Sequence, residues 1–338
     1  MPRQSTHFWT SKSRIVLFHT AMRHFAVTLR DVGRPLIYQR LDAPDAVVDL
    51  GTALQATIAS VRPERLVMTA PGDWRVLQRL RAMARDEGLE LELCDDRHFF
   101  VTVREFAAHA SVRKTLRLEY FYRELRKRRD IFMDGVQPIC GQWNFGTDNR
   151  GAFDNDGPRD VPEPACFKPD ALTREVFDLV GSRFANHPGS LDSFVWPVTR
   201  DQALETLTHF VRERLPQFGR YQDAMWPGQP WLYHSHLPAA LNLKLLDPRE
   251  VVAAAIDAYE KGDAPLSSVE ASCVRFSAGE NTFAAFTGPA CPSISNRTHL
   301  KRASICPRST GLVSPTSTAS PTRSARPSSS AMPITSSV

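Results

Sequence analysis

Apolar residues recur at helical spacing in the first third of the chain and alternate with short runs typical of strands. Residues 14–30 place Val16, Phe18, Met22 and Phe25 on one face of a predicted helix. The same reasoning predicts helices over 47–60 and 74–87, and strands over 35–41, 65–70 and 89–94. Because helix and strand alternate, we expect a Rossmann-like α/β domain with a parallel sheet. The chain opens on a helix where such domains usually open on a strand, so we expect the first strand to be missing.

The strand pattern stops near residue 110. Residues 115–130 predict a strongly basic helix, and a loop rich in Gly, Asn and Asp follows from Met133 to Pro164. Only helices are predicted beyond it, over 169–187, 199–215 and 247–261, with Thr199 as an N-cap and Pro248 in a first turn. We therefore predict an α/β domain over 1–110, a basic helix and interdomain linker over 111–165, and an incomplete all-α domain over 166–270.

The last segment, residues 271–338, follows neither pattern. From Arg308 onward, 15 of 31 residues are Ser or Thr, a composition that cannot bury enough apolar surface to fold. No Asp or Glu follows Glu280, whereas six Lys or Arg do. Residues 1–280 then hold 36 basic against 37 acidic residues, a net charge of −1, so the overall +5 does not indicate a nucleic-acid partner. A disordered tail is the simplest interpretation.

Composition also excludes several classes of protein. No run of about 18 apolar residues is present, so no membrane span is predicted. The N-terminus lacks the apolar core of a secretory signal. The six cysteines show no CxxC pair and no regular spacing, which argues against a disulfide framework or a zinc site. These features favour a cytoplasmic protein.

Two segments combine aromatic side chains with polar or charged ones. The helix around Tyr120–Arg129 could neutralise phosphates and stack on bases, but a solvated helix with its rings in the core explains the pattern equally well. The loop 139–150 gathers Trp143, Asn144 and Asp148. Such a loop suits a ligand pocket or an ordered connection between domains.

A third segment, 218–242, gathers hydroxyl, imidazole and amide side chains. Such groups at a helix start can cradle a phosphate. No nucleophile elbow is present for a catalytic triad, and no suitably spaced carboxylate completes a metal site with His234 and His236. A helix-rich core with polar caps is the alternative interpretation.

Six motifs in order resemble the iron–sulfur bacterial cryptochromes and photolyases, also known as photolyase-related proteins. The resemblance runs from about residue 14 to Glu270. The motifs are TAMRHFAVTLRDVG (20–33), TAPGDWRV (69–76), EYFYRELRKRRDIFMDG (119–135), CGQWNFGTDNR (140–150), FGRYQDAM (218–225) and LYHSHLPAALNLKLLDPREVV (232–252).

The resemblance implies an α/β antenna domain followed by an all-α domain that binds FAD. It also implies a lumazine antenna, a [4Fe–4S] cluster, and a monomer that acts on damaged DNA. The activity implied is light-driven repair of (6-4) pyrimidine photoproducts, with the lesion flipped out of the duplex. A cryptochrome-type photoreceptor without repair activity, or a non-catalytic remnant, would have the same motifs.

The resemblance also assigns site residues. Tyr221, His234, Ser235, His236, Leu237 and Asn242 match the flavin-phosphate side of the pocket. Asp223 matches an acid close to the flavin and the lesion, and Asp148 and Asn149 match a loop at the same cavity. Arg126, Lys127 and Arg128 are expected to contact DNA. The chain departs from the family at Pro238, which stands where a serine would face the phosphates.

The family's cluster cysteines and catalytic histidines do not appear in residues 271–338, so no metal ligand is assigned. Reading that segment one base out of frame permits codons for the family motifs GWREYVRGIYW and YAHHIQR, in family order. We therefore predict a reading-frame slip at Glu270 or just after it, which the nucleotide sequence of the gene would test. The half-pocket left by such a slip is expected to bind FAD weakly or not at all.

Overall fold

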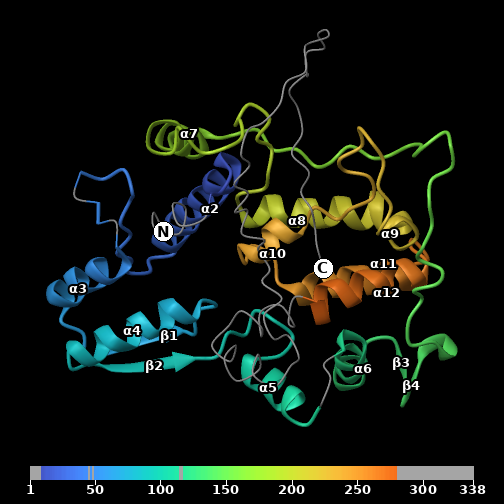
Figure 1. Cartoon of the computed structure of the whole chain (residues 1–338), viewed down its shortest axis with the longest axis horizontal. Coiled ribbons are helices and arrows are strands. Elements are labelled where there is room, and N and C mark those ends of the chain that lie inside the picture. The colour runs from blue at the N-terminus through green and yellow to red at the C-terminus, as the bar shows by residue number, and fades with distance from the viewer. Residues whose placement is uncertain (1–8, 45, 48, 114–116, 280–338) are drawn as a thin grey trace, which may run out of the picture.

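The computed structural model describes residues 9–44, 46–47, 49–113 and 117–279. Within them the fold is mainly helical, with a small parallel sheet at one side (Figure 1). The predicted presence of many helices and a parallel sheet is confirmed, and the division into an α/β and an all-α domain stays a prediction. No helix in the described ranges has both the length and the apolar character needed to cross a bilayer.

The α/β part consists of three helices and two strands. Each helix is capped by a side-chain oxygen of the preceding residue, from Ser11, Asp49 and Asp73 respectively. In chain order the elements are α2 (Lys12–Asp31), α3 (Leu50–Val61), β1 (Arg65–Thr69), α4 (Trp74–Asp86) and β2 (Glu90–Cys94). Strands β1 and β2 pair in parallel, from Arg65 opposite Glu90 to Thr69 opposite Cys94. The sequence therefore located both strands and all three helices.

The strand predicted over 35–41 is wrong. Residues 34–40 form no regular secondary structure and belong to neither sheet, and Ile37 is 61% exposed. A strand exists only as a hydrogen-bonded partner of another strand. Among the described residues, no strand pairs with this segment, although Leu36 and Ile37 line an apolar pocket with Leu54 of α3.

Helix α2 packs on α7 (Ala171–Arg183) (Figure 1). Ile15 and Val16 of α2 are buried in one cluster with Val176 and Val180 of α7. The first predicted helix of the α/β part is thus also a structural component of the helical part.

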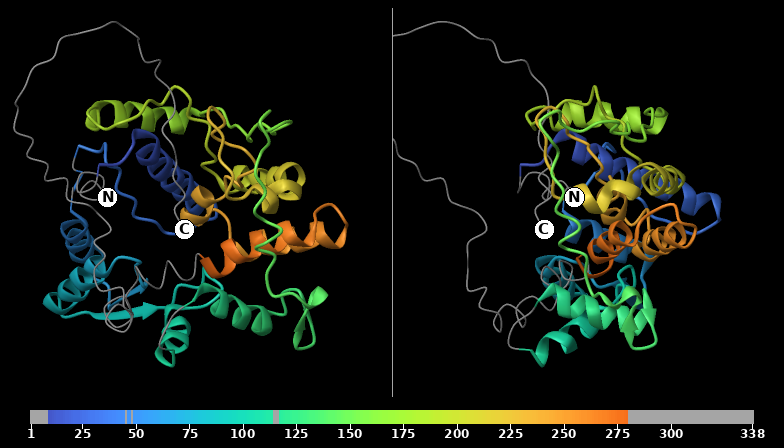
Figure 2. Two further views of the ribbon diagram at one scale, coloured as in Figure 1. Left: turned by 45° about the vertical axis from the view of Figure 1, so that its right-hand side comes forward. Right: turned by 90° about the vertical axis from the view of Figure 1, so that its right-hand side faces the viewer.

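The main core lies in the helical part. It buries Phe106, Leu125, Phe210, Leu215 and Val251, each 2% exposed or less. Its helices are α5 (Val103–Ser111), α6 (Leu118–Arg129), α8 (Arg200–His209), α9 (Leu215–Tyr221), α10 (Pro238–Asn242), α11 (Pro248–Glu260) and α12 (Leu266–Cys273). Figure 2 shows α11 and α12 together near the middle of this part.

The predicted helix over 199–215 is confirmed at its start but not along its whole length. Thr199 caps α8, in a capping box with Gln202. The π-helix η2 (Phe210–Arg214) then separates α8 from α9. Pro216 has no N–H for the carbonyl of Arg212, so the regular ladder of hydrogen bonds cannot continue there.

The linker carries a two-residue hairpin, β3 (Met133–Asp134) with β4 (Gln137–Pro138), and a 3-10 turn, η1 (Ile139–Gly141). The expected boundary at residue 270 falls inside α12, and the π-helix η3 (Val274–Gly279) continues it. Cys273 and Phe276 are buried in the main core. The predicted tail beyond residue 279 lies outside the described residues.

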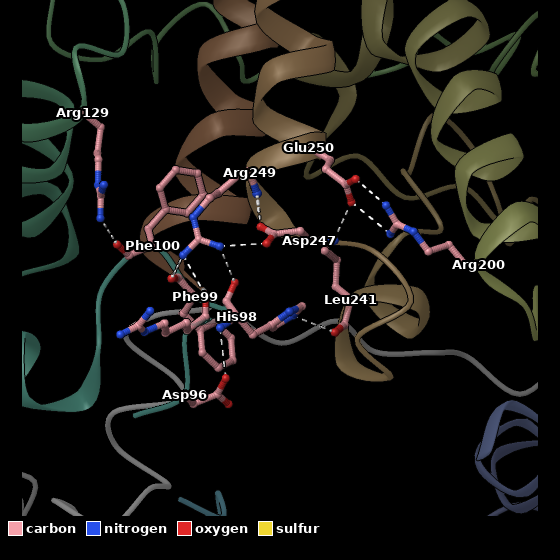
Figure 3. Close-up of polar contacts among 11 residues, drawn as sticks. Asp96, His98, Phe99, Phe100, Arg129, Arg200, Leu241, Asp247, Arg249 and Glu250 are labelled. Carbon is pink, nitrogen blue, oxygen red and sulfur yellow. Dashed lines mark hydrogen bonds and ion pairs between the residues drawn. The ribbon is translucent and has the colours of Figure 1, made fainter. Parts of the chain in front are cut away.

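Residues 96–100, which follow β2, connect the sheet to the helical part (Figure 3). Arg249 of α11 donates to the carbonyls of Arg97 (2.8 Å) and Phe99, and its guanidinium lies 5.8 Å from the Phe100 ring centre. The ring of His98 hydrogen-bonds the carbonyl of Leu241 at 3.1 Å. The turn after the sheet is therefore fixed directly on α10 and α11.

Candidate functional site

The segment 231–242 forms a tight turn that leads into the five-residue helix α10. Ser235 is buried, and its Oγ accepts a 3.4 Å hydrogen bond from the amide of Leu237. Leu237 is fully buried and packs in the main core. Asn242 is exposed at the end of α10. Pro238 is the first residue of α10, where its missing N–H would have no helical partner.

His234 and His236, the two histidines of this segment, are both partly buried, and the pKa of each is lowered. Burial, and then the charge of Arg214, lower the pKa of His236 to about 3. Burial, and then the charges of Arg275 and Arg214, lower the pKa of His234. Both rings are therefore neutral at pH 7. Nε2 of His236 is buried without a hydrogen-bond partner among the described residues.

Arg214, in η2, was not identified from the sequence. Its side chain is 1% exposed and donates to the carbonyls of Leu232 and Pro162, while its Nε is buried without a partner in the described chain. These hydrogen bonds hold the linker against the turn at 231–237. Arg is rarely buried unless its guanidinium is paired. The sequence alone does not distinguish a buried Arg from an exposed one.

Tyr221 lies at the end of α9, between two aromatic rings. Its ring is stacked on Phe153 at 4.4 Å and on Tyr233 at 5.4 Å between centroids. The guanidinium of Arg220 lies 5.2 Å from its centre. Because both faces are covered, Tyr221 has only its hydroxyl group and ring edge available to a ligand.

Asp223 is exposed just beyond α9 and is held by one residue of η3. Its Oδ1 accepts from Nη2 of Arg275 at 2.9 Å, and Nε of Arg275 donates to Gln222 at 3.1 Å. The expected acid is therefore near His234, because the carboxylate of Asp223 also acts on the pKa of that ring.

The loop with Asp148 and Asn149 places these two residues differently. Asp148 is exposed, whereas Asn149 is 2% exposed and donates through Nδ2 to the carbonyl of Ser267 at 3.0 Å. The Oδ1 of Asn149 is buried without a hydrogen-bond partner among the described residues. It lies near Gly219, where an added Cβ would come within 2.7 Å of it.

Arg126 does not lie on the surface. It is 1% exposed and donates to three carbonyls, those of Ile131 (3.0 Å), Trp143 (3.2 Å) and Phe132 (2.6 Å). The guanidinium thereby fixes the turn after α6 and the start of the Trp143 loop. The expectation that Arg126 contacts DNA is corrected on this ground, because a guanidinium so buried and bonded cannot reach a phosphate.

Lys127 and Arg128 are exposed, and their contact with DNA stays a prediction. Lys127 lies 5.2 Å from the centre of the Trp143 ring, and Arg123 lies 5.4 Å from it. Arg128 pairs with Glu105 at 2.8 Å. Of the three predicted residues, Lys127 therefore presents the most accessible cation.

An open groove of about 680 Å³ lies at the carboxyl ends of β1 and β2. Parallel sheets bind ligands at this edge. Its lining is highly charged and includes Asp96, which pairs with Lys244 at 2.6 Å. No group of three or more His, Cys, Asp or Glu side chains able to hold a metal occurs in the described part of the chain.

Comparisons with known proteins agree with the motifs. The family model for "Deoxyribodipyrimidine photo-lyase-related protein" matches residues 1–196, more than half of the chain. A (6-4) photolyase of Agrobacterium fabrum (strain C58 / ATCC 33970) is 39% identical over 259 residues, which are 77% of this chain and 51% of the relative. The chain thus spans about half the length of this curated relative. It belongs to the deoxyribodipyrimidine photolyase-related protein family.

Proposed function

We propose that the chain binds FAD, with the weak affinity expected of a partial pocket, and repairs (6-4) pyrimidine photoproducts in DNA in a light-dependent reaction. The observation that carries this proposal is the 39% identity to a protein named (6-4) photolyase. Since the chain spans about half of that relative, both the activity and the substrate belong to the proposal.

Three buried polar atoms support a cofactor site, two of them beside the 231–242 turn and the third beside α9 and α12. They are Nε2 of His236, Nε of Arg214 and Oδ1 of Asn149, each without a hydrogen-bond partner among the described residues. Buried polar atoms in native proteins are nearly always satisfied, so unpaired ones call for an explanation such as water or a ligand. One donor and two acceptors suit a cofactor rich in hydroxyl and amide groups, as FAD is.

The residues have separate roles in this proposal. Reduced FAD, when bound, supplies the electron that light drives into the lesion. His236 and Arg214 hold its polar chain, and Asn149 orients it from the linker side. The hydroxyl of Tyr221 contributes a further hydrogen bond, and Asp223 lies at the exposed edge where a flipped base would enter.

The other cofactors of the resemblance have less support. The described cysteines are Cys94, Cys140 and Cys166, all exposed, and Cys273, which is buried. They do not fit a four-cysteine cluster, and we assign no step to one. A lumazine antenna is proposed at the groove beyond β1 and β2, because that edge is the usual ligand site of a parallel sheet.

DNA would contact the exposed face of α6. Lys127 and Arg123 lie beside Trp143, so cations and an aromatic ring are available to phosphates and bases. Helix α6 ends in four consecutive basic residues, of which only Arg126 is buried.

The decisive experiment uses the full chain with added FAD, and the FAD is first reduced. The protein is then mixed with an oligonucleotide that carries one (6-4) photoproduct, and the mixture is illuminated with blue light. We expect loss of the lesion in the light and none in the dark. Asp223→Asn should slow repair while FAD absorbance is retained. Light-driven flavin reduction without repair would instead identify a photoreceptor. A chain that retains no flavin would be a non-catalytic remnant.

A further inference from the structure

Helix α12 buries a carboxyl group beside the linker. Glu270 is 3% exposed, and its Oε1 has no hydrogen-bond partner among the described residues. An isolated carboxylate is very costly to remove from water, so a buried carboxyl group either keeps its proton or has a free cation beside it. The groups that surround Glu270 decide between these two states.

The cation that acts on this carboxyl group is Arg126 of α6, and it is already engaged. Its guanidinium donates to the carbonyls of Ile131 (3.0 Å), Phe132 (2.6 Å) and Trp143 (3.2 Å). Each of its three nitrogen atoms therefore has a carbonyl partner. Because Arg126 is committed in this way, the buried Glu270 side chain keeps its proton in the closed structure.

The other titratable groups beside Glu270 carry no charge near neutral pH. They are Tyr122 of α6 and Cys273 of α12, both buried, and burial raises the pKa of each. Helices α9 and α11 and the π-helix η3 also pack on α12, but their titratable side chains have partners elsewhere. Tyr221 stacks on Phe153, Glu250 pairs with Arg200, Tyr259 packs on Phe132, Arg249 contacts residues 97–99, and Arg275 pairs with Asp223.

The linker loop 143–149 rests on α12 next to this carboxyl group. Nδ2 of Asn149, whose residue is 2% exposed, donates to the carbonyl of Ser267 at 3.0 Å. From the same loop, the backbone amide of Phe145 acts on the Glu270 carboxyl group. The carbonyl of Trp143, at the start of the loop, is held from α6. The contacts that fix the loop thus surround Glu270.

We infer that loss of the proton from Glu270 releases the loop 143–149 from α12, which makes this loop a pH-sensitive latch on the linker. The proton passes to the solvent. The carboxylate left behind competes with the Trp143 carbonyl for Arg126, whose bond to that carbonyl is the longest of its three. Movement of the loop then admits water to the new charge.

The direction of the effect follows from the two states of the carboxyl group. Burial raises the pKa of Glu270 to about 7 in the closed structure, whereas a hydrated carboxyl group in the opened loop titrates near its ordinary value of 4.5. The opened form is therefore favoured increasingly as the pH rises from about 4.5 to 7, by up to about tenfold per pH unit. Above that window both forms are ionised, and the effect is constant.

This inference goes beyond the proposed function and needs no flavin. It has one consequence for that function. The loop carries Trp143, which lies beside Lys127 and Arg123 on the face of α6 proposed for DNA. Release of the loop would change how this face is presented, and that consequence rests on the proposed function.

The test is hydrogen exchange of the full chain, followed by mass spectrometry between pH 5 and 8 and corrected for the intrinsic pH dependence of amide exchange. Each pH is measured without urea and at several urea concentrations below the unfolding transition. Local opening exposes little surface, so its exchange rate changes little with urea, whereas exchange through global unfolding rises steeply. Glu270→Gln removes the titration, and the exposed Glu260→Gln is the matched control.

We expect protection of peptides covering 143–149 to fall by at least about tenfold from pH 5 to 8 in the unaltered chain, with little dependence on urea. Peptides of α11 should stay more protected than the loop at every pH. Glu260→Gln should behave as the unaltered chain does, and Glu270→Gln should hold the loop protection constant.

Three results would overturn the inference. The first is loop protection in the unaltered chain that does not change with pH. The second is a fall in loop protection with the same steep urea dependence as α11, because the loop would then open through global unfolding. The third is a pH dependence that persists in a folded Glu270→Gln chain. If that variant does not fold, the pH and urea series of the unaltered chain still decides between local and global opening.

Discussion

The amide of Gly219 in α9 donates a 3.0 Å hydrogen bond to the hydroxyl of Ser268 in α12, and the two backbones touch at this point. A Cβ on residue 219 would lie 2.5 Å from Cα of Ser268. We therefore expect Gly219→Ala to lower the free energy of unfolding by about 1–3 kcal/mol through overpacking, measured by urea denaturation. Gly181→Ala in α7, with nothing within 4 Å, should be neutral or stabilising. Equal effects at the two positions would contradict this contact.

Glu270 makes stability depend on pH. Burial raises the pKa of its carboxyl to about 7, although the charge of Arg126 and the amide of Phe145 oppose the shift. The folded chain thus keeps a proton that the unfolded chain releases near pH 4.5. Stability should fall by about 3 kcal/mol as the pH rises from about 4.5 to 7, since one pKa unit corresponds to about 1.4 kcal/mol.

Glu270→Gln should flatten this part of the stability profile, measured by urea denaturation between pH 4.5 and 8. The exposed Glu260, changed to Gln, is the control and should leave the slope as it is. A slope that persists in Glu270→Gln would assign the pH dependence to another group.

Substitutions of Lys127 and Arg126 should separate an effect on DNA binding from an effect on folding. Lys127→Ala removes an exposed cation, so we expect weaker binding of duplex DNA and a salt dependence reduced by about one phosphate contact. Its melting temperature should stay close to that of the unaltered chain. Fluorescence anisotropy at several salt concentrations measures the effect, with the exposed Lys261→Ala as control.

Arg126→Ala should instead destabilise the fold by several kcal/mol, because three buried carbonyls lose their donor. A stable Arg126→Ala protein with lost DNA affinity would restore the original assignment of this residue to DNA.

Arg249→Met should loosen the turn at 96–100. Without the guanidinium, the carbonyls of Arg97 and Phe99 lose their donor, and we expect about 2 kcal/mol of destabilisation. Hydrogen exchange of a peptide covering 95–101 should become faster. Arg212→Met, where the exposed side chain pairs with its neighbour Glu213, should leave that peptide unchanged.

The sequence predicted elements whose signals are local. Helical spacing located α2, α4, α7 and α11 to within a few residues, and Thr199 identified the start of α8. Alternation identified β1 and β2, but the same kind of signal at 35–41 failed because a strand needs a neighbour that the pattern cannot supply.

The site was harder to predict, since its residues act through distant partners. The burial of Arg126 depends on carbonyls of 131, 132 and 143, and that of Arg214 on carbonyls of 162 and 232. A sequence rich in Arg does not show which of its guanidinium groups are buried. Asn149 is buried beside α9 and α12, and the cofactor role that the resemblance assigns to it stays a prediction.

The contact of α2 with α7 also constrains how the chain folds during its synthesis. The apolar face of α2, with Ile15 and Val16, is made early, whereas its partner residues Val176 and Val180 are translated about 160 positions later. At the usual rates of bacterial and eukaryotic ribosomes, that interval is on the order of ten seconds. During this interval the apolar face of α2 is exposed on the nascent chain. A chaperone that covers this face would therefore raise the fraction of chains that reach the folded state.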